Sequence, residues 1–271
     1  MPDEFAQFEH QSWQRVANLY EESWSNLTRS FIPALLAAVN IRSGVRVLDV
    51  ACGPGYVSEA ILAAGGTPLG IDFSSEMIRL ARQRNAKIEF REGDAQALDF
   101  PDASFDVVTM NFGILHLSDP EKAISESRRV LRPGGRYGFT VWADATVSLG
   151  ARIVETALTE YAEMEVGLPK GPDYFAYSRP DECLRTLLDV GFDGSTFDFQ
   201  TEVVQWQVPT ETFLFEVERD AGVRTAALLQ RQRPEMLDLI SRRIALGVAP
   251  YANDRGYAIP FAAHIVTIRT P

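Results

Sequence analysis

Apolar residues follow two different spacings in the first half of the chain. From Phe5 to Asn40 they recur three and four positions apart, which predicts two helices, the second starting near Thr28 or kinked at Pro33. Farther along, short apolar runs predict five buried strands, at 44–51, 67–73, 87–95, 104–113 and 136–143. Segments with helical spacing lie between several of these runs, at 58–64, 74–85 and 119–135. Alternating strands and helices indicate right-handed crossovers and an α/β core built on a mostly parallel sheet, covered on both faces.

The pattern loosens after residue 143. It predicts helices at 148–166, 179–191 and 210–247, and strands at 196–208 and 261–269. We therefore expect two parts in this chain. The core comprises 41–145, 178–206 and 258–271, and a helical cap that would cover the substrate comprises 1–40, 146–177 and 207–257.

Composition and charge narrow the possible partners. At 46% hydrophobic and 23% charged residues the chain is globular, and its net charge of −11 repels phosphodiester backbones. We expect a small-molecule substrate and no nucleic acid, with the basic stretch 230–243 forming a solvated helix face. A secretion signal would need basic and apolar residues where this chain begins MPDEFAQFEHQ, and no run of about 18 apolar residues occurs. A cytoplasmic protein without a membrane span is the expectation.

Metal and disulfide chemistry find no support in the sequence. The two cysteines, Cys52 and Cys183, cannot form a disulfide framework, and the three histidines have no zinc-ligand spacing. Cys183 lies in a predicted helix, and Cys52 is small enough to pack beside a ligand. We therefore expect no metal site.

The first predicted strand ends in an aspartate and a glycine turn, VLDVACGPGYVS at 47–58. In an open parallel sheet the ligand crevice lies beyond the carboxyl ends of the strands, so this turn should face it. Gly53 and Gly55 would let the backbone approach a ligand, although they would equally suit a plain strand-to-helix turn. A dinucleotide fold needs a third glycine that is missing here, and the carboxylate of Asp49 suits a cation better than a pyrophosphate.

This combination resembles motif I of the class I S-adenosylmethionine-dependent methyltransferases, and the likeness extends from about Val45 to Trp142. In that family an acidic residue at the end of the second strand holds the ribose, a position that Asp72 occupies here. Asp94 and Ala95 match the family's adenine contacts, and SFDVVTMNFGILHLSDPEKAISESRRVLRPGGRYGFTVW resembles the ubiquinone-biosynthesis-like subgroup of small-molecule enzymes. The resemblance implies a doubly wound, Rossmann-like sheet of seven strands whose last strand is antiparallel.

The same resemblance implies S-adenosylmethionine as cofactor and a set of residues around it. Taken alone, Asp72 and Asp94 would also suit plain caps of a helix or turn. The implied cofactor site comprises Tyr20, Asp49, Ala51, Cys52, Gly53, Gly55, Asp72, Phe73, Met77, Asp94, Ala95, Asn111 and Phe112.

Methyl transfer from a sulfonium is an in-line displacement, so the protein mainly aligns and desolvates the two reactants. A general base is needed only for an acceptor that arrives protonated, and His116, after the fourth strand, is the candidate. Many relatives carry two adjacent histidines here, whereas Leu117 follows His116 in this chain, so a packing role for His116 stays open. An aromatic or apolar metabolite, with an oxygen, nitrogen or carbon acceptor, would contact Trp13, His116, Trp142, Tyr174 and Tyr177.

Three alternatives remain open at this point. The chain could bind S-adenosylmethionine but catalyse a non-methylating rearrangement or act as a regulator. An NAD-dependent oxidoreductase is disfavoured by the missing glycine, and an RNA methyltransferase by the charge. For each of these functions we expect a monomer or a homodimer.

Overall fold

The computed structural model describes residues 3–271 and is built on one mixed sheet with strand order β3-β2-β1-β4-β5-β8-β6. Strands β1 to β5 run parallel, and β8 lies antiparallel between β5 and β6. This confirms the predicted α/β fold and its antiparallel last strand. An eighth strand, the two-residue β7, pairs with β8 and was not expected. The strands are β1 (Arg46–Val50), β2 (Thr67–Asp72), β3 (Glu89–Glu92), β4 (Phe105–Asn111), β5 (Leu131–Trp142), β6 (Asp193–Val208), β7 (Ala252–Asn253) and β8 (Gly256–Arg269).

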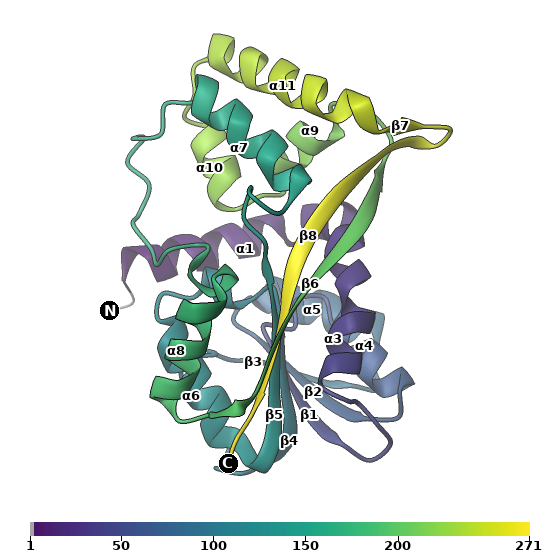
Figure 1. Cartoon of the computed structure of the whole chain (residues 1–271), viewed down its shortest axis with the longest axis vertical. Coiled ribbons are helices and arrows are strands. Elements are labelled where there is room, and N and C mark those ends of the chain that lie inside the picture. Colours follow the sequence, from purple (N-terminus) through teal and green to yellow (C-terminus); the bar gives the residue numbers. More distant parts are fainter. Residues whose placement is uncertain (1–2) are drawn as a thin grey trace.

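Helices cover both faces of the sheet (Figure 1). Those that follow β1 and β2 pack with α3 on one face, and α6 and α8 pack on the other, where their apolar side chains join β4, β5 and β8 in the largest core cluster. These helices are α3 (Ile32–Ala38), α4 (Tyr56–Ala63), α5 (Ser75–Arg84), α6 (Pro120–Val130) and α8 (Pro180–Val190).

The amino-terminal segment forms three α-helices where two were predicted. Helix α1 (Glu4–Glu22) ends at Ser23, whose hydroxyl donates to the Leu19 carbonyl and so satisfies an acceptor of the last turn. Helix α2 (Trp24–Thr28) and a 3-10 turn (Arg29–Phe31) then lead into α3, which has Pro33 in its first turn. The break at Ser23 has no glycine or proline to mark it.

A second layer of helices lies beyond the carboxyl ends of the parallel strands, and β6 and β8 run continuously from the sheet into it (Figure 1). Its members are α7 (Leu149–Tyr161), α9 (Phe213–Asp220), α10 (Arg224–Leu229) and α11 (Pro234–Val248). The single helix predicted at 210–247 is thus divided into three, with breaks at Gly222 and before Pro234. The division into core and cap stays our prediction, and its boundaries at 206 and 258 fall within β6 and β8.

Helix α1 crosses the molecule between the sheet and the upper helices α7, α9 and α10 (Figure 1). It therefore lies above the strand ends where a ligand crevice is expected. Within residues 3–271, no helix combines the length and the apolar character that a membrane crossing requires.

Candidate functional site

A cavity of about 750 Å³ lies at the carboxyl ends of β1, β2, β4 and β5, beneath α1. It is bounded by the sheet on one side and by α1, α7, α9 and the segment around Tyr174 on the others. Most of the residues predicted for the site line it: Trp13, Tyr20, Ala51, Asp72, Phe73, Met77, Asp94, Ala95, Asn111, Phe112, His116, Trp142 and Tyr174.

The glycine turn after β1 supports one wall of this cavity. Gly55 adopts a left-handed conformation with φ +85° as the N-cap of α4, and a Cβ there would lie 2.8 Å from the ring of Phe90. Gly53, with φ +52°, directs its N–H to the carboxylate of Asp72 at 2.9 Å. The glycines thus join the end of β1 to the end of β2, and they shape the cavity without lining it.

Asp72 lies in the cavity wall with 5% of its surface exposed. One carboxylate oxygen accepts from the Gly53 N–H and the other from the Ser74 N–H, each at 2.9 Å. Burial raises the pKa of Asp72 to about 6, opposed by these two hydrogen bonds. Each oxygen retains acceptor capacity for one more donor, which suits a pair of hydroxyl groups.

Four other predicted residues lie outside the cavity besides Gly55. Asp49 is fully buried beneath the turn, where it accepts hydrogen bonds from Ser58 Oγ at 2.6 Å and Thr109 Oγ1 at 3.2 Å, and burial raises its pKa to about 7. Side chains of the protein therefore hydrogen-bond to both oxygens of the Asp49 carboxylate. Tyr177 packs edge-on against Phe139 in the sheet core. The other two are Cys52, buried against α5 and β3, and Gly53.

The ends of β1 and β4 meet in strained conformations. Ala51 and Phe112 both have positive φ, +53° and +56°, which is uncommon for residues other than glycine and requires support from the surroundings. Gly113 makes their approach possible, because a Cβ at that position would lie 2.6 Å from the Cβ of Ala51. The side chain of Asn111 accepts from Thr140 Oγ1 at 2.5 Å, so this strand end is fixed on β5.

The end of β3 closes the cavity beside the sheet edge. Asp94 is exposed and accepts from the Gln96 N–H at 2.8 Å, whereas Ala95 is buried. Gln96, which sequence reasoning missed, also lines the cavity and accepts from Ser118 Oγ at 3.1 Å. This contact ties the segments after β3 and β4 to each other.

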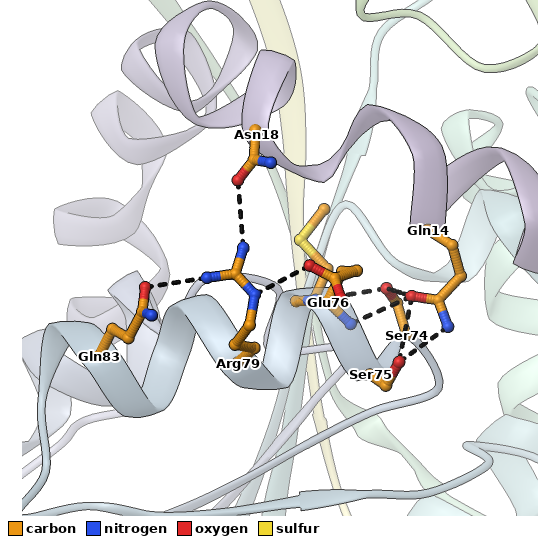
Figure 2. Close-up of polar contacts among 8 residues, drawn as sticks. Gln14, Asn18, Ser74, Ser75, Glu76, Arg79 and Gln83 are labelled. Atoms are coloured by element: carbon orange, nitrogen blue, oxygen red, sulfur yellow. Dashed lines mark hydrogen bonds and ion pairs between the residues drawn. The ribbon is translucent and has the colours of Figure 1, made fainter.

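Helix α1 is fastened over the site by its contact with α5 (Figure 2). Gln14 Oε1 accepts from Ser74 Oγ and from the Glu76 N–H, each at 3.0 Å, so a side chain of α1 satisfies a backbone donor in the first turn of α5. One turn later, Asn18 accepts from Arg79 at 3.3 Å. These contacts orient α1 so that one of its faces, which carries Trp13 and Tyr20, lines the cavity.

Glu9 and Trp13 of α1 both contact His116. Its Nδ1 lies 3.0 Å from Glu9 Oε2, and the ring of Trp13 meets the imidazole edge-on with centroids 4.8 Å apart. The Glu9 side chain is fully buried, and its second oxygen, Oε1, has no hydrogen-bond partner within residues 3–271. Tyr20, on the same helix, shares a hydrogen bond with Thr28 Oγ1 at 2.9 Å, and burial raises the pKa of its phenol to about 12.

Aromatic side chains form the wall beyond the strand ends. Phe112 and Trp142 stack with ring centroids 4.1 Å apart, and Trp24 and Phe261 pack around Trp142. All four line the cavity. Trp24 and Phe261 were not among the residues predicted for the site, because helical or strand spacing alone does not distinguish an aromatic side chain in the core from one that lines a cavity. We call these four residues the aromatic chamber.

The part of the cavity facing the upper helices contains the carboxyl group of Glu218. Burial raises the pKa of Glu218 to about 7, and it lines the cavity together with Tyr174. Arg224, in the same wall, lies over the ring of Phe5 at 5.4 Å. Glu218 and Arg224 carry no sequence signal, since they lie in the loosely patterned second half of the chain. Across residues 3–271 no group of three histidine, cysteine or acidic side chains gathers as a metal site.

Comparisons with known proteins agree with this geometry. Residues 48–139 match the family model described as a methyltransferase domain. The demethylmenaquinone methyltransferase of Renibacterium salmoninarum is 43% identical over 179 residues, which cover 63% of this chain and 76% of that relative.

Two solved structures show the same fold at low identity. A phosphoethanolamine N-methyltransferase of Haemonchus contortus, solved with phosphomonomethylethanolamine and S-adenosylhomocysteine, superposes with TM-score 0.57 at 20% identity, covering 100% of this chain and 61% of that one. The [4+2]-cyclase SpnF superposes with TM-score 0.53 at 22% identity, covering 92% and 83%. Because both are distant in sequence, they support the fold alone. The chemistry has to be argued from the residues of the site.

Proposed function

Since the chain belongs to the class I S-adenosylmethionine-dependent methyltransferases of the ubiquinone and menaquinone type, we propose that it methylates a flat, quinone-like small molecule in its reduced form. One observation carries the proposal. A single cavity is lined both by the strand-end residues that match the family's cofactor motifs and by the aromatic chamber.

The cofactor would lie along the strand ends. Asp72 has acceptor capacity left for the two ribose hydroxyls, Asp94 and Ala95 would meet the adenine, and Asn111 and Phe112 would flank the methionyl part. Tyr20 would close the site from α1. When bound, S-adenosylmethionine would supply a methyl group whose bond to sulfur breaks with the electron pair staying on sulfur, while an electron pair of the acceptor forms the new bond and the acceptor loses one proton.

The acceptor would lie in the aromatic chamber. Stacked rings such as Phe112 and Trp142 favour a flat apolar ligand. The relative from Renibacterium is named for demethylmenaquinone, which is a molecule of this class. Methyl transfer needs an electron-rich acceptor, and a quinone is electron-poor, so we infer that the hydroquinone is the form that reacts.

His116 would take the proton of that hydroquinone. It lines the cavity, and its Nδ1 is engaged by Glu9, so Nε2 is the ring nitrogen left to accept a proton. The apolar walls exclude water from the reacting groups, which strengthens the electrostatic interactions there. We propose a monomer or homodimer as the working form, with neither nucleic acid nor metal taking part.

Calorimetric titration followed by an activity assay tests the function. We expect micromolar binding of S-adenosylmethionine and S-adenosylhomocysteine and none of NAD. With 1,4-naphthoquinol kept reduced under nitrogen, methylated product and S-adenosylhomocysteine should form in equal amounts, whereas the oxidised 1,4-naphthoquinone is the matched control and should not react. Binding of NAD in place of the sulfur ligands would contradict the proposal.

The same assay separates the main alternative. A protein of this fold that binds the cofactor without transferring its methyl group would bind both sulfur ligands, yet release no S-adenosylhomocysteine with any acceptor. The cyclase among the structural neighbours makes this comparison necessary, because one fold hosts several chemistries. Methyl release from a panel that also includes a catechol and an aromatic amine would decide the class of acceptor.

A further inference from the structure

We propose that Glu9 is a positioning residue for His116: it holds the imidazole with the proton on Nδ1, so that Nε2 faces the acceptor as a base. The inference rests on the proposed function, since it assigns His116 a proton to remove. It adds a residue that lies in none of the motifs of the α/β core, because Glu9 belongs to the first helix of the chain.

The contact between the two residues carries the proposal. Nδ1 of His116 lies 3.0 Å from Glu9 Oε2, a hydrogen-bond distance. A carboxylate can only accept, so this bond places the proton of a neutral imidazole on Nδ1 and leaves the lone pair on Nε2. The ring is largely buried: its side chain is 18% accessible, and Trp13 meets it edge-on.

The Glu9 carboxylate is buried although only one of its two oxygens has a hydrogen-bond partner among residues 3–271. Its side chain is 0% exposed and its Oε1 has no partner within the part of the chain that the structure describes. A buried acceptor without a donor is unfavourable for folding, and a buried carboxylate more so. A residue of this kind is expected where its charge or acceptor is needed for something other than stability.

The helix that carries Glu9 is fixed in place. Glu9 and Trp13 are four residues apart and therefore share a face of α1, and both contact His116. The next contacts along the helix, Gln14 with Ser74 and Asn18 with Arg79, anchor α1 to α5 (Figure 2). A carboxylate on such a rigid element can hold one orientation of the imidazole ring.

The proton transfer balances within the site. The acceptor's O–H bond breaks, its electron pair stays on oxygen, and the proton forms a bond to Nε2. The resulting imidazolium carries a positive charge beside the Glu9 carboxylate, which stabilises it until Nε2 returns the proton to water. Without the carboxylate the ring would be free to hold its proton on Nε2, where it cannot act as a base.

The tautomer of His116 is the direct test. The chain has three histidines, so nitrogen-15 spectra of the imidazoles resolve each one, and His116→Gln assigns the signal. For the neutral imidazole, with S-adenosylhomocysteine added, we expect the Nδ1–H form in the native protein. Glu9→Met, whose side chain offers no strong acceptor for Nδ1–H, should lose this preference and shift the ring toward the Nε2–H form.

Turnover provides the second readout. With 1,4-naphthoquinol as acceptor, Glu9→Met should lower kcat about 100-fold or more, while the dissociation constant of S-adenosylmethionine changes less than about twofold. Glu22→Met, an exposed position on the same helix, is the matched control and should match the native protein in both measurements. Should Glu9→Met fail to fold, Glu9→Gln keeps the shape of the side chain but removes the charge that stabilises the imidazolium, and it is expected to lower kcat as well.

The outcomes are distinguishable. An unchanged tautomer in Glu9→Met overturns the proposal even if the enzyme is active, and so does full kcat of that variant with naphthoquinol. If the native protein methylates no acceptor, the proposed function fails. The spectra still report whether Glu9 sets the tautomer, because they need no turnover.

Discussion

Asp72 connects the glycine turn to the cavity, so its ionisation should control cofactor binding. Burial raises the pKa of Asp72 to about 6 in the free protein, whereas hydrogen bonds from ribose hydroxyls, if Asp72 binds the cofactor as proposed, would favour the ionised form and lower the pKa in the complex. Affinity for S-adenosylhomocysteine should therefore be constant above about pH 7 and fall below pH 6, by at most about 10-fold for each unit. Calorimetry between pH 5 and pH 8 measures this directly.

Asp72→Asn separates this effect from other titrating groups. The variant keeps the shape of the side chain but loses one acceptor oxygen, and we expect affinity at pH 8 to fall about 10-fold or more, since a charge-assisted hydrogen bond contributes roughly 1.5–3 kcal/mol. The loss of affinity below pH 6 should be smaller than in the native protein. Asp99→Asn, exposed and outside the cavity, is the control; equal affinity of Asp72→Asn and native protein would show that Asp72 does not hold the cofactor.

At the residue scale, a side chain's place at the cavity could be predicted where a strand end determines its position. Asp72 and Asn111 end β2 and β4, and parallel strands bring their ends to one crevice. Asp49 also ends its strand region, yet its side chain points beneath the turn to Ser58 and Thr109, a direction that spacing alone does not give. Glu9 was missed because its contact spans 107 positions in the sequence.

Gln14 makes several of the hydrogen bonds between helix α1 and α5. Gln14 supplies the acceptor for the Glu76 N–H and for Ser74 Oγ, and Ser74 is itself the N-cap of α5 (Figure 2). Gln14→Leu removes these bonds and leaves a backbone donor of the first turn without its partner, which typically destabilises by about 1–3 kcal/mol. We expect faster amide exchange throughout α1 and a weaker affinity for S-adenosylhomocysteine, because α1 covers the cavity.

Gln11→Leu is the matched control for this prediction. Gln11 lies on the exposed side of the same helix, so the variant makes the same chemical change without breaking the contact with α5. Exchange and affinity should stay close to those of the native protein. If Gln14→Leu exchanged no faster than Gln11→Leu, the contact shown in Figure 2 would not hold α1 in place.

At the scale of elements, hydrophobic periodicity predicted the helices and strands of the core well, because each packs one apolar face. It was weaker at helix breaks. Ser23 ends α1 through a hydrogen bond to its own helix, and Gly222 and Pro234 divide a segment whose apolar spacing continues across both breaks. The extra length of β8 was missed too, since its first residues pack against cap helices instead of the sheet core.

The whole molecule consists of two layers joined by continuous strands. β6 and β8 carry Trp206 and Phe261 from the sheet into the upper layer, where they join a core cluster with Leu214 of α9 and Ile244 of α11. The cavity lies where these layers meet, and α1 separates the sheet from α7, α9 and α10 (Figure 1). No single motif predicts whether both layers respond to a bound ligand, because that response depends on the packing of the whole chain.

Cofactor binding should therefore protect elements of both layers, but only those that line the cavity. At S-adenosylhomocysteine concentrations 100 times its dissociation constant, binding stabilises the native state by about 2.7 kcal/mol, which limits the slowing of amide exchange to about 100-fold. We expect a slowing of at least about 10-fold in α1 and in the segment after β2, measured by hydrogen exchange with mass spectrometry.

Helices α8 and α11 are the internal controls for this experiment, one in each layer. Neither contributes a residue to the cavity within residues 3–271, so exchange that reflects local opening should change little in them. Uniform slowing in every element would mean that the chain opens only as one unit, and the proposed cap would then not move separately from the core. Slowing confined to the sheet, with α1 unchanged, would mean that α1 does not close over the cofactor, and the placement of Tyr20 and Trp13 at the site would have to be abandoned.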